Sequence, residues 1–135
     1  MRYVLDTTAF SAGMRRDFAL LKLLKEFRPG DIVTVPPVVA EIQYGIERLN
    51  SSSKKCLLLK SERDRLLSII KVLPWSSDAS NHFGKIKAHL EQSGKMIDDF
   101  DIAIGAIAIA HKCGVITTNQ GHFKRIKNLE CKSWE

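Results

Sequence analysis

Short apolar runs alternate along the chain with longer segments whose apolar residues recur at helical spacing. The runs at residues 3–5, 31–35 and 115–118 are β-branched and apolar and border on turn residues, which is typical of buried strands. Weaker runs at residues 71–74 and 129–134 predict a short strand and a final edge strand. Helices are predicted from about Thr8, over 17–27, 38–49, 54–70 and 78–92, and from Asp101 to Gly114.

Alternation of strands and helices is typical of an α/β fold. It predicts a parallel sheet with helices on both faces, and it places ligand sites beyond the carboxyl ends of the strands. Pro36 and Pro37 suit the first turn of the helix that follows them. The segment at 54–92 is predicted to form a lid or a pair of arms. A chain of 135 residues fits one domain, over residues 1–135, with a single core.

Charge, cysteine content and hydropathy indicate what kind of partner the protein binds and where in the cell it is expected. Lys and Arg outnumber Asp and Glu by 21 to 15, and the net charge of +6 favours a polyanionic partner, although a merely soluble basic protein fits it equally well. The three cysteines are widely spaced, which argues against a disulfide framework or a zinc ribbon. The apolar stretch after Asp101 spans about ten residues, well short of the ~20 that cross a bilayer. We therefore expect a soluble cytoplasmic protein without a membrane partner.

Three carboxylates are candidates for one site. Asp6 ends the first strand, Glu41 lies one turn into its helix, and Asp101 opens the apolar helix. If they meet, they form a site for a hard divalent cation, which prefers oxygen ligands. Each also has a simpler explanation: Asp6 can cap a helix, Glu41 can be a surface side chain, and two of Asp98, Asp99 and Asp101 can cap the helix that they precede.

Taken together, five segments carry a family resemblance. They are Val4-Leu-Asp-Thr-Thr-Ala-Phe-Ser11, Val38-Val-Ala-Glu-Ile-Gln-Tyr-Gly45, Phe100-Asp-Ile-Ala-Ile-Gly-Ala-Ile-Ala108, and the closing segments 115–126 and 129–134. In order, spacing and total length the chain resembles the PIN-domain family, in particular the VapC toxins of toxin-antitoxin pairs. The resemblance implies a three-layer α/β/α fold with a central, mostly parallel sheet. It also implies a metal-dependent endoribonuclease.

The same resemblance assigns the site. It matches Asp6, Glu41 and Asp101 to the family's metal-binding positions, with Asp101 rather than Asp98 or Asp99 in register. Many relatives carry another acid where this chain has Asn119, which supplies no charge but can position a water molecule or a phosphate. Thr8 stands where relatives often have Asn, and its hydroxyl can still orient Asp6.

Cofactor and partners follow from this site. Mg²⁺ or Mn²⁺ would activate water for phosphodiester hydrolysis, which leaves 5′-phosphate and 3′-hydroxyl ends. The resemblance implies an RNA substrate, a VapB-like antitoxin and a homodimer. Leucines at 57–59, 66 and 67 are candidates for a partner groove, unless they pack within the monomer. Phosphate contacts are expected from flanking basic residues: Arg15, Arg16, Lys124, Arg125 and Lys127.

Three alternatives compete with this hypothesis. A PIN-like RNA-binding or regulatory module with weak or no catalysis would also fit the absent fourth acid. Phosphatase and phosphoacceptor folds place Asp at a strand end too, but this chain lacks their second acid beside Asp6. Metal-free cleavage would use the four histidines, but His82, His89 and His122 are better explained as surface or packing residues, with Phe123 anchored in the core.

Overall fold

A five-stranded parallel sheet forms the centre of the computed structural model, which describes residues 1–135. Its strand order is β3-β2-β1-β4-β5. The strands are β1 (Tyr3–Leu5), β2 (Ile32–Thr34), β3 (Lys71–Val72), β4 (Gly114–Ile116) and β5 (Cys131–Lys132). Each overlaps a run that the apolar pattern predicts, so the parallel α/β fold is confirmed.

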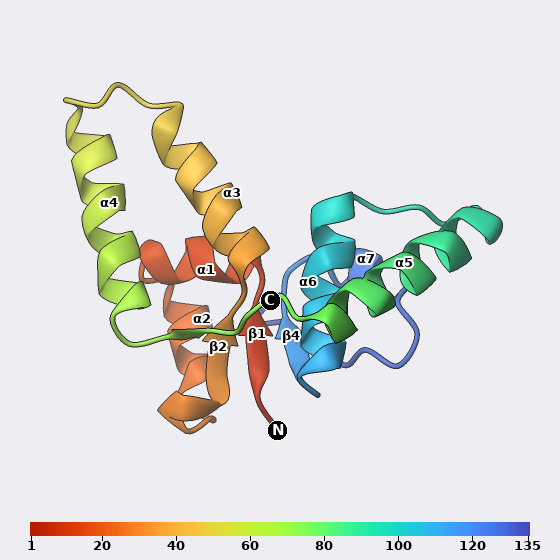
Figure 1. Ribbon diagram of the computed structural model, residues 1–135. Helices are drawn as coiled ribbons and strands as arrows, with labels where there is room; N and C mark the ends of the chain where they lie inside the picture. The colour runs from red at the N-terminus through yellow and green to blue at the C-terminus, as the bar shows by residue number, and fades with distance from the viewer.

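Helices cover both faces of this sheet. They are α1 (Thr7–Met14), α2 (Phe18–Leu24), α3 (Pro36–Glu47), α4 (Lys54–Leu67), α5 (Ser77–Gln92), α6 (Asp99–Ala110) and α7 (Gln120–Phe123). Helices α1 to α4 lie on one side of the strands and α5 to α7 on the other (Figure 1). The sequence pattern did not predict α7 or the 3-10 turn at Pro29–Asp31, because both are too short to show a periodicity.

The strand order reverses beside β1. From β1 the chain moves outward to β2 and β3, and it then returns to build β4 and β5 on the other side. Because crossover connections between parallel strands are right-handed, this reversal sends the later helices to the opposite face. It also opens a crevice at the carboxyl ends of β1 and β4. Leu5 pairs with Ile116 there, so the next residues, Asp6 and Thr117, lie side by side.

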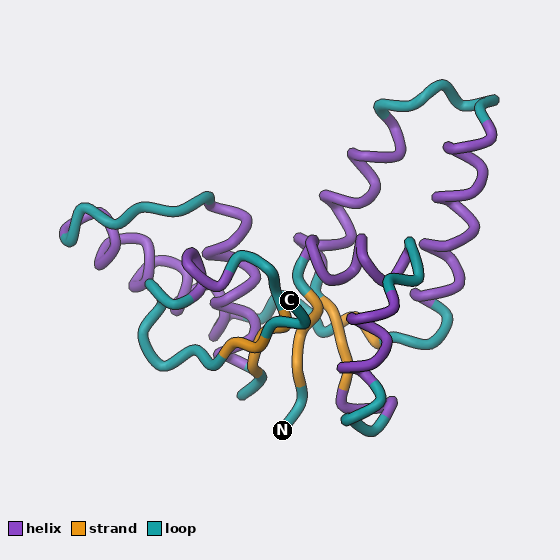
Figure 2. Tube along the Cα trace, turned by 180° about the vertical axis from the view of Figure 1, so that it is seen from behind, coloured by secondary structure: helices purple, strands orange, loops and turns teal.

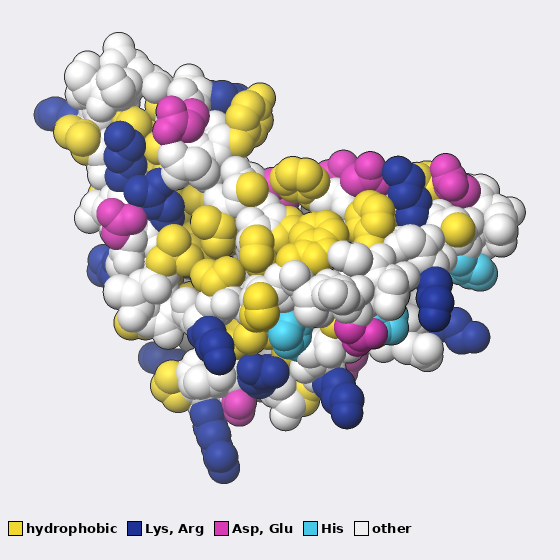
Figure 3. Space-filling model, in the orientation of Figure 1, with side chains coloured by type: hydrophobic (Ala, Val, Ile, Leu, Met, Phe, Trp, Pro, Cys, Tyr) yellow, Lys and Arg dark blue, Asp and Glu magenta, His cyan; other side chains and the backbone are white.

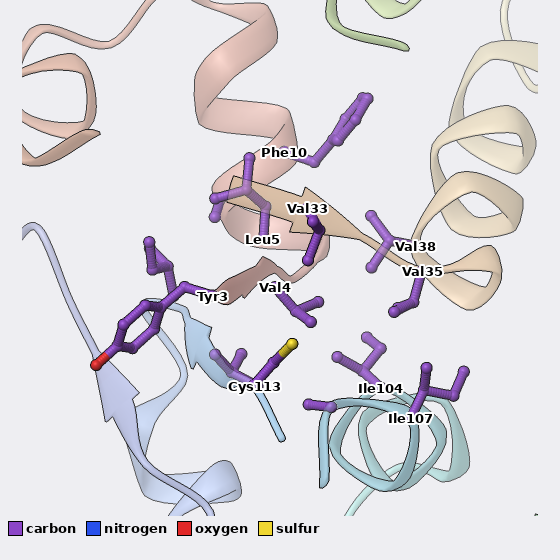
Figure 4. Packing of buried hydrophobic residues seen from close by; sticks show 14 of the residues in the cluster. Tyr3, Val4, Leu5, Phe10, Val33, Val35, Val38, Ile104, Ile107 and Cys113 are labelled. Carbon is purple, nitrogen blue, oxygen red and sulfur yellow. The ribbon is translucent and has the colours of Figure 1, made fainter. Parts of the chain in front are cut away.

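Alternate residues of β1 pack on the two helical layers. Figure 4 shows Val4 on the side of Ile104 and Ile107 of α6, and Leu5 on the side of Phe10 of α1. All five side chains are at most 1% exposed. Helix α6 is buried along the whole of residues 102–108, which explains why its sequence is apolar on every face.

Two helical arms project from the sheet. Figures 1 and 2 show α3 and α4 side by side as one arm, and α5 projecting on the other side of the molecule. Leu57 and Leu58 of α4 are 57% and 60% exposed, whereas Leu66 is buried and Leu59 packs against the core. Only part of the predicted partner groove is therefore open surface. None of the helices has the length and apolar character needed to cross a bilayer.

Candidate active site

Asp6 lies at the switch point of the sheet and is 1% exposed. It caps α1, because its Oδ1 accepts hydrogen bonds from the Ala9 backbone N–H (2.9 Å) and from Thr8 Oγ1 (2.6 Å). Its Oδ2 accepts a hydrogen bond from Thr117 Oγ1 at 2.5 Å. The predicted capping role and the predicted bond from Thr8 are both confirmed. The hydrogen bond between Asp6 Oδ2 and Thr117 therefore links the end of β1 to the end of β4.

The Asp6 carboxyl group has a raised pKa. Burial is the main cause, since it removes water from the charged form, and the negative charge of Asp101 adds to the effect. The hydrogen bonds from Thr117, Thr8 and Ala9 act in the opposite direction and do not cancel it. The charged form of Asp6 is thus costly in the absence of a neighbouring cation.

Glu41 faces the same crevice from α3. Its Oε1 accepts a hydrogen bond from Thr7 Oγ1 at 2.5 Å, and the side chain is half-buried. Its pKa is raised, first by burial and then by the charges of Asp101, Asp98 and Asp6, while the Thr7 bond lowers it. A surface glutamate turned toward bulk water would not experience these charges. Its hydrogen bond with Thr7, the residue after Asp6, keeps Glu41 beside the other acids.

Asp101 lies in the first turn of α6, and its side chain is 15% exposed. Its Oδ2 is 3.0 Å from Nδ1 of His122, which follows β4 in helix α7. The sequence predicts a structural role for His122, and the structure adds a specific contact of its imidazole with a carboxylate of the site. Phe123, its neighbour, is fully buried as predicted.

The two other acids near Asp101 have different surroundings. Asp98 occupies the N-cap position of α6, but its side chain makes no capping hydrogen bond. Asp99 is exposed and forms an ion pair with Lys87 of α5, with 3.1 Å between Nζ and Oδ1. The expectation that these side chains cap the helix was wrong, because Asp99 points to α5 instead. Among these acids, only Asp101 contacts His122 of α7.

The three carboxylates suit a hard cation in their chemistry. They supply only oxygen donors, which Mg²⁺ and Mn²⁺ prefer, and Asp6 and Glu41 both experience the negative charge of Asp101. However, no three His, Cys, Asp or Glu side chains are gathered closely enough in the structure to form a ready ligand cluster. The donor set therefore fits the expected ion, while a closed coordination shell is not preformed.

A hydrogen bond joins Thr117 and Asn119 in the closing motif. Asn119 is exposed at the N-cap position of α7, where its side chain makes no capping bond. Its backbone N–H donates to Thr117 Oγ1 at 2.7 Å. Thr117 is fully buried, and it is this residue that holds Asp6. Sequence reasoning missed Thr117, although the pairing of β1 with β4 would have placed it beside Asp6.

The surroundings of the site combine an apolar hollow with scattered cations. Figure 3 shows hydrophobic side chains gathered in a hollow between the α3–α4 arm and helices α5 and α6. A cavity of about 360 Å³ there is lined by Pro36, Pro37, Ala40, Trp75, Phe83, Asp99, Phe100 and Ala103. Of the expected phosphate-binding residues, Arg16 is ion-paired with Glu62 (2.9 Å), and Arg125 donates to the Met96 carbonyl (3.0 Å). Both have structural partners.

Comparison with known proteins agrees with this fold. The family model of the PIN domain matches residues 3–129. Ribonuclease VapC2 of Rickettsia felis is 36% identical over 98 residues, which are 73% of this chain and 70% of that protein. Ribonuclease VapC2 of Haemophilus influenzae is 28% identical over 99% of this chain and 98% of its own. The crystal structure of VapBC2 from Rickettsia felis bound to a DNA fragment from its promoter superposes with a TM-score of 0.88, at 29% identity and full coverage of both chains.

Proposed function

This chain belongs to the PIN domain family, and from that premise we propose that it is the endoribonuclease toxin of a toxin-antitoxin pair. The ribonuclease relatives support the activity. One observation of the site carries the proposal furthest: a buried carboxylate, Asp6, is held by three hydrogen bonds at the switch point, within the electrostatic range of Asp101. Polyanionic RNA is also a suitable substrate for a chain of net charge +6.

We further propose that Asp6, Glu41 and Asp101 hold Mg²⁺ or Mn²⁺. The bound ion would supply Lewis-acid assistance to water attack on a phosphodiester. Residues of the chain orient the carboxylates: Thr117 and Thr8 fix Asp6, Thr7 fixes Glu41, and His122 fixes Asp101. Asn119 is exposed at the same edge of the sheet, where its amide can bind a phosphate oxygen or a water molecule.

The proposed partners follow from the same assignment. A VapB-like antitoxin would cover the acidic site, and the toxin would form a homodimer. The exposed Leu57 and Leu58 on the α3–α4 arm offer an apolar contact for the antitoxin. The structure of VapBC2 from Rickettsia felis lends support to a toxin that acts with a partner chain.

RNA cleavage by the antitoxin-free protein tests the activity. We expect cleavage with Mg²⁺ or Mn²⁺, none with EDTA, and 5′-phosphate ends on the products. Asp101→Asn should slow cleavage by at least about a hundredfold, whereas Asp98→Asn and Asp99→Asn should have smaller effects. Products with 2′,3′-cyclic phosphate would contradict hydrolysis by water. A larger effect at Asp98 or Asp99 would show that the wrong acid is assigned.

The competing function is a PIN-like RNA-binding or regulatory module. It is favoured by the absence of a carboxylate at Asn119 and by the open arrangement of the three acids. The two functions differ in turnover. A protein that binds RNA but does not cleave it with either ion, and whose effect on growth survives Asp6→Ala, would be a binding module.

A further inference from the structure

A polar cavity of about 380 Å³ adjoins the acidic site. It is separate from the apolar hollow, and its lining consists of Thr7, Thr8, Ser11, Arg15, Thr118, Trp134 and Glu135. Thr8 connects the cavity to the site, because the same hydroxyl that donates to Asp6 accepts a hydrogen bond from the Thr118 backbone N–H at 3.1 Å. A group bound in this cavity would therefore lie one side chain away from the central carboxylate.

The spacing of three residues on α1 builds one wall of the cavity. Thr7, Ser11 and Arg15 are four residues apart, so they lie in a row on one face of the helix. Helical side chains lean toward the N-terminus, and this direction tilts Arg15 toward the acidic end of the row. Its Nη1 donates to Ser11 Oγ at 3.0 Å, which fixes the guanidinium along this wall.

Arg15 differs from the neighbouring arginine in having free donors. Arg16 is engaged with Glu62, whereas none of the ion pairs of the structure includes Arg15. A guanidinium has five N–H donors, and only the bond to Ser11 is formed. Arg15 is exposed, so its remaining donors face the cavity and solvent. It is also the only cation in the lining.

The chemistry of the lining favours a phosphodiester. A guanidinium fork matches the oxygens of a phosphate. The Ser11 hydroxyl accepts from Arg15 and can donate its own hydrogen to the same group, whereas the hydroxyls of Thr7 and Thr8 already donate to Glu41 and Asp6. RNA that enters an acidic site also needs a cation nearby to offset the repulsion of its phosphates. Trp134, half-buried at the cavity, offers an aromatic face to a ribose or base, and Glu135 is the one lining group that opposes an anion.

We propose that this cavity binds a phosphodiester of the RNA strand next to the one that is cleaved, with Arg15 as the residue that contacts its oxygens. The proposal rests on the proposed ribonuclease function, and it names the place where the substrate strand leaves the acidic site. It assigns the cavity a role in binding rather than in bond cleavage.

RNA binding by a cleavage-deficient protein tests this role. The probe is a labelled single-stranded RNA of mixed sequence, titrated into Asp101→Asn protein at several salt concentrations. Adding Arg15→Ala should raise the Kd about tenfold. It should also reduce the slope of log affinity against log salt by about 0.7, the value for one lost phosphate contact on a single strand. The Kd of Arg15→Lys should lie between the value for the parent protein and the value for Arg15→Ala, because lysine keeps the charge without the guanidinium fork.

Arg28→Ala is the matched control, because it removes the same charge from an exposed arginine. Arg28 precedes β2 and so lies at the amino ends of the strands, opposite to the site. Equal effects of Arg15→Ala and Arg28→Ala on Kd and on the salt slope would overturn the proposal. This outcome is distinct from failure of the proposed function, which requires that wild-type protein does not cleave RNA. Unchanged melting temperatures would show that both arginine variants are folded.

Discussion

At the scale of single residues, the site is organised around one buried carboxylate and the hydroxyls that hold it. Thr8 and Thr117 donate to different oxygens of Asp6, and Thr7 does the same for Glu41. Hydroxyls can orient a carboxylate without neutralising its charge, unlike Lys or Arg. The carboxylates are thereby positioned while their charge stays available for a cation.

Thr117 is predicted to be a positioning residue. Thr117→Val removes the donor to Asp6 Oδ2 and should cost about 1–3 kcal/mol of folding free energy, because a buried carboxylate oxygen loses its partner. Cleavage should fall roughly tenfold or more as Asp6 loses its orientation. Chemical denaturation and initial rates measure the two effects. Thr117→Ser should restore both, and a failure of Ser to restore the rate would contradict a role for the hydroxyl.

Asp6→Asn should separate activity from stability. The pKa of Asp6 is raised on folding, so its charge is less favourable in the folded state than in the unfolded state at neutral pH. Removing the charge should therefore leave the melting temperature unchanged or higher, while cleavage is lost. Thermal unfolding at pH 7 checks this prediction. A fall of several degrees would mean that the ionised carboxylate stabilises the fold.

At the scale of elements, close packing of strands brings the two halves of the site together. A side chain at Gly114, the first residue of β4, would place its Cβ 2.5 Å from the ring of Tyr3 and 3.1 Å from the carbonyl oxygen of Glu130. The ring of Tyr3 packs against Phe27 with 5.1 Å between centroids. Neither the packed ring nor the backbone can move far, so only glycine fits between β1 and β5.

Gly114→Ala should destabilise the protein by about 1–3 kcal/mol through overpacking. Gly84→Ala is the control, because nothing lies within 4 Å of the added Cβ and the residue is in the middle of α5. That change should instead stabilise the helix by roughly 0.5–1 kcal/mol. Denaturant unfolding of the two variants measures the difference. Equal effects would show that β4 can shift to accept a side chain.

An ion-pair network joins α1 to α4. Glu62 binds Arg16 on Oε1 (2.9 Å) and Arg65 on Oε2 (2.5 Å), and Arg65 also donates to the Gly13 carbonyl at 3.2 Å. These bonds lower the pKa of Glu62 on folding. The stabilisation is therefore present above the ordinary glutamate pKa of 4.5 and is lost as the pH falls through the lower folded value.

Glu62→Gln should lower the melting temperature at neutral pH and have little effect in acid. The difference from wild type should shrink as the pH falls from 4.5 through the lower folded pKa of Glu62, below which both proteins lack the charge. Thermal unfolding as a function of pH measures it. A difference that stays constant into acid would show that the carboxylate contributes through packing alone.

At the scale of the whole molecule, a basic protein surrounds an acidic crevice. The net charge is +6, yet Asp6, Glu41, Asp98 and Asp101 lie close enough to influence the ionisation of Asp6 or Glu41. Such an arrangement attracts a polyanion at long range and needs a cation at short range. The two requirements are consistent with a metal-dependent nuclease.

Divalent metal should stabilise the folded protein. An ion that binds only the folded state raises its stability by mass action, and we expect Mn²⁺ to raise the melting temperature by roughly 5 °C at saturation. Asp101→Asn should abolish most of this rise, while Asp64→Asn, on the exposed face of α4, should retain it. Differential scanning fluorimetry measures the shift. An equal rise in melting temperature in both variants would show that the ion does not bind at Asp101.

Apolar periodicity correctly predicted the strands and the long helices, and the family motifs proposed three acids for the site, because both are local signals in the chain. The sequence also predicted the link between Thr8 and Asp6, two residues apart in the chain. It did not predict the contacts between residues that are far apart in the chain and meet across the sheet. Only the tertiary structure placed Thr117 on Asp6 and His122 on Asp101, because the register of β1 with β4 and the short turn of α7 decide them.

The polar cavity was likewise decided by tertiary structure. The row of Thr7, Ser11 and Arg15 can be read from the helical spacing of α1, but its opposite wall comes from Thr118 and Trp134, more than a hundred residues later in the sequence. Packing of the closing segment against the switch point brings the two walls together. Helical spacing thus predicts the row on α1, whereas long-range strand pairing sets which residues face it.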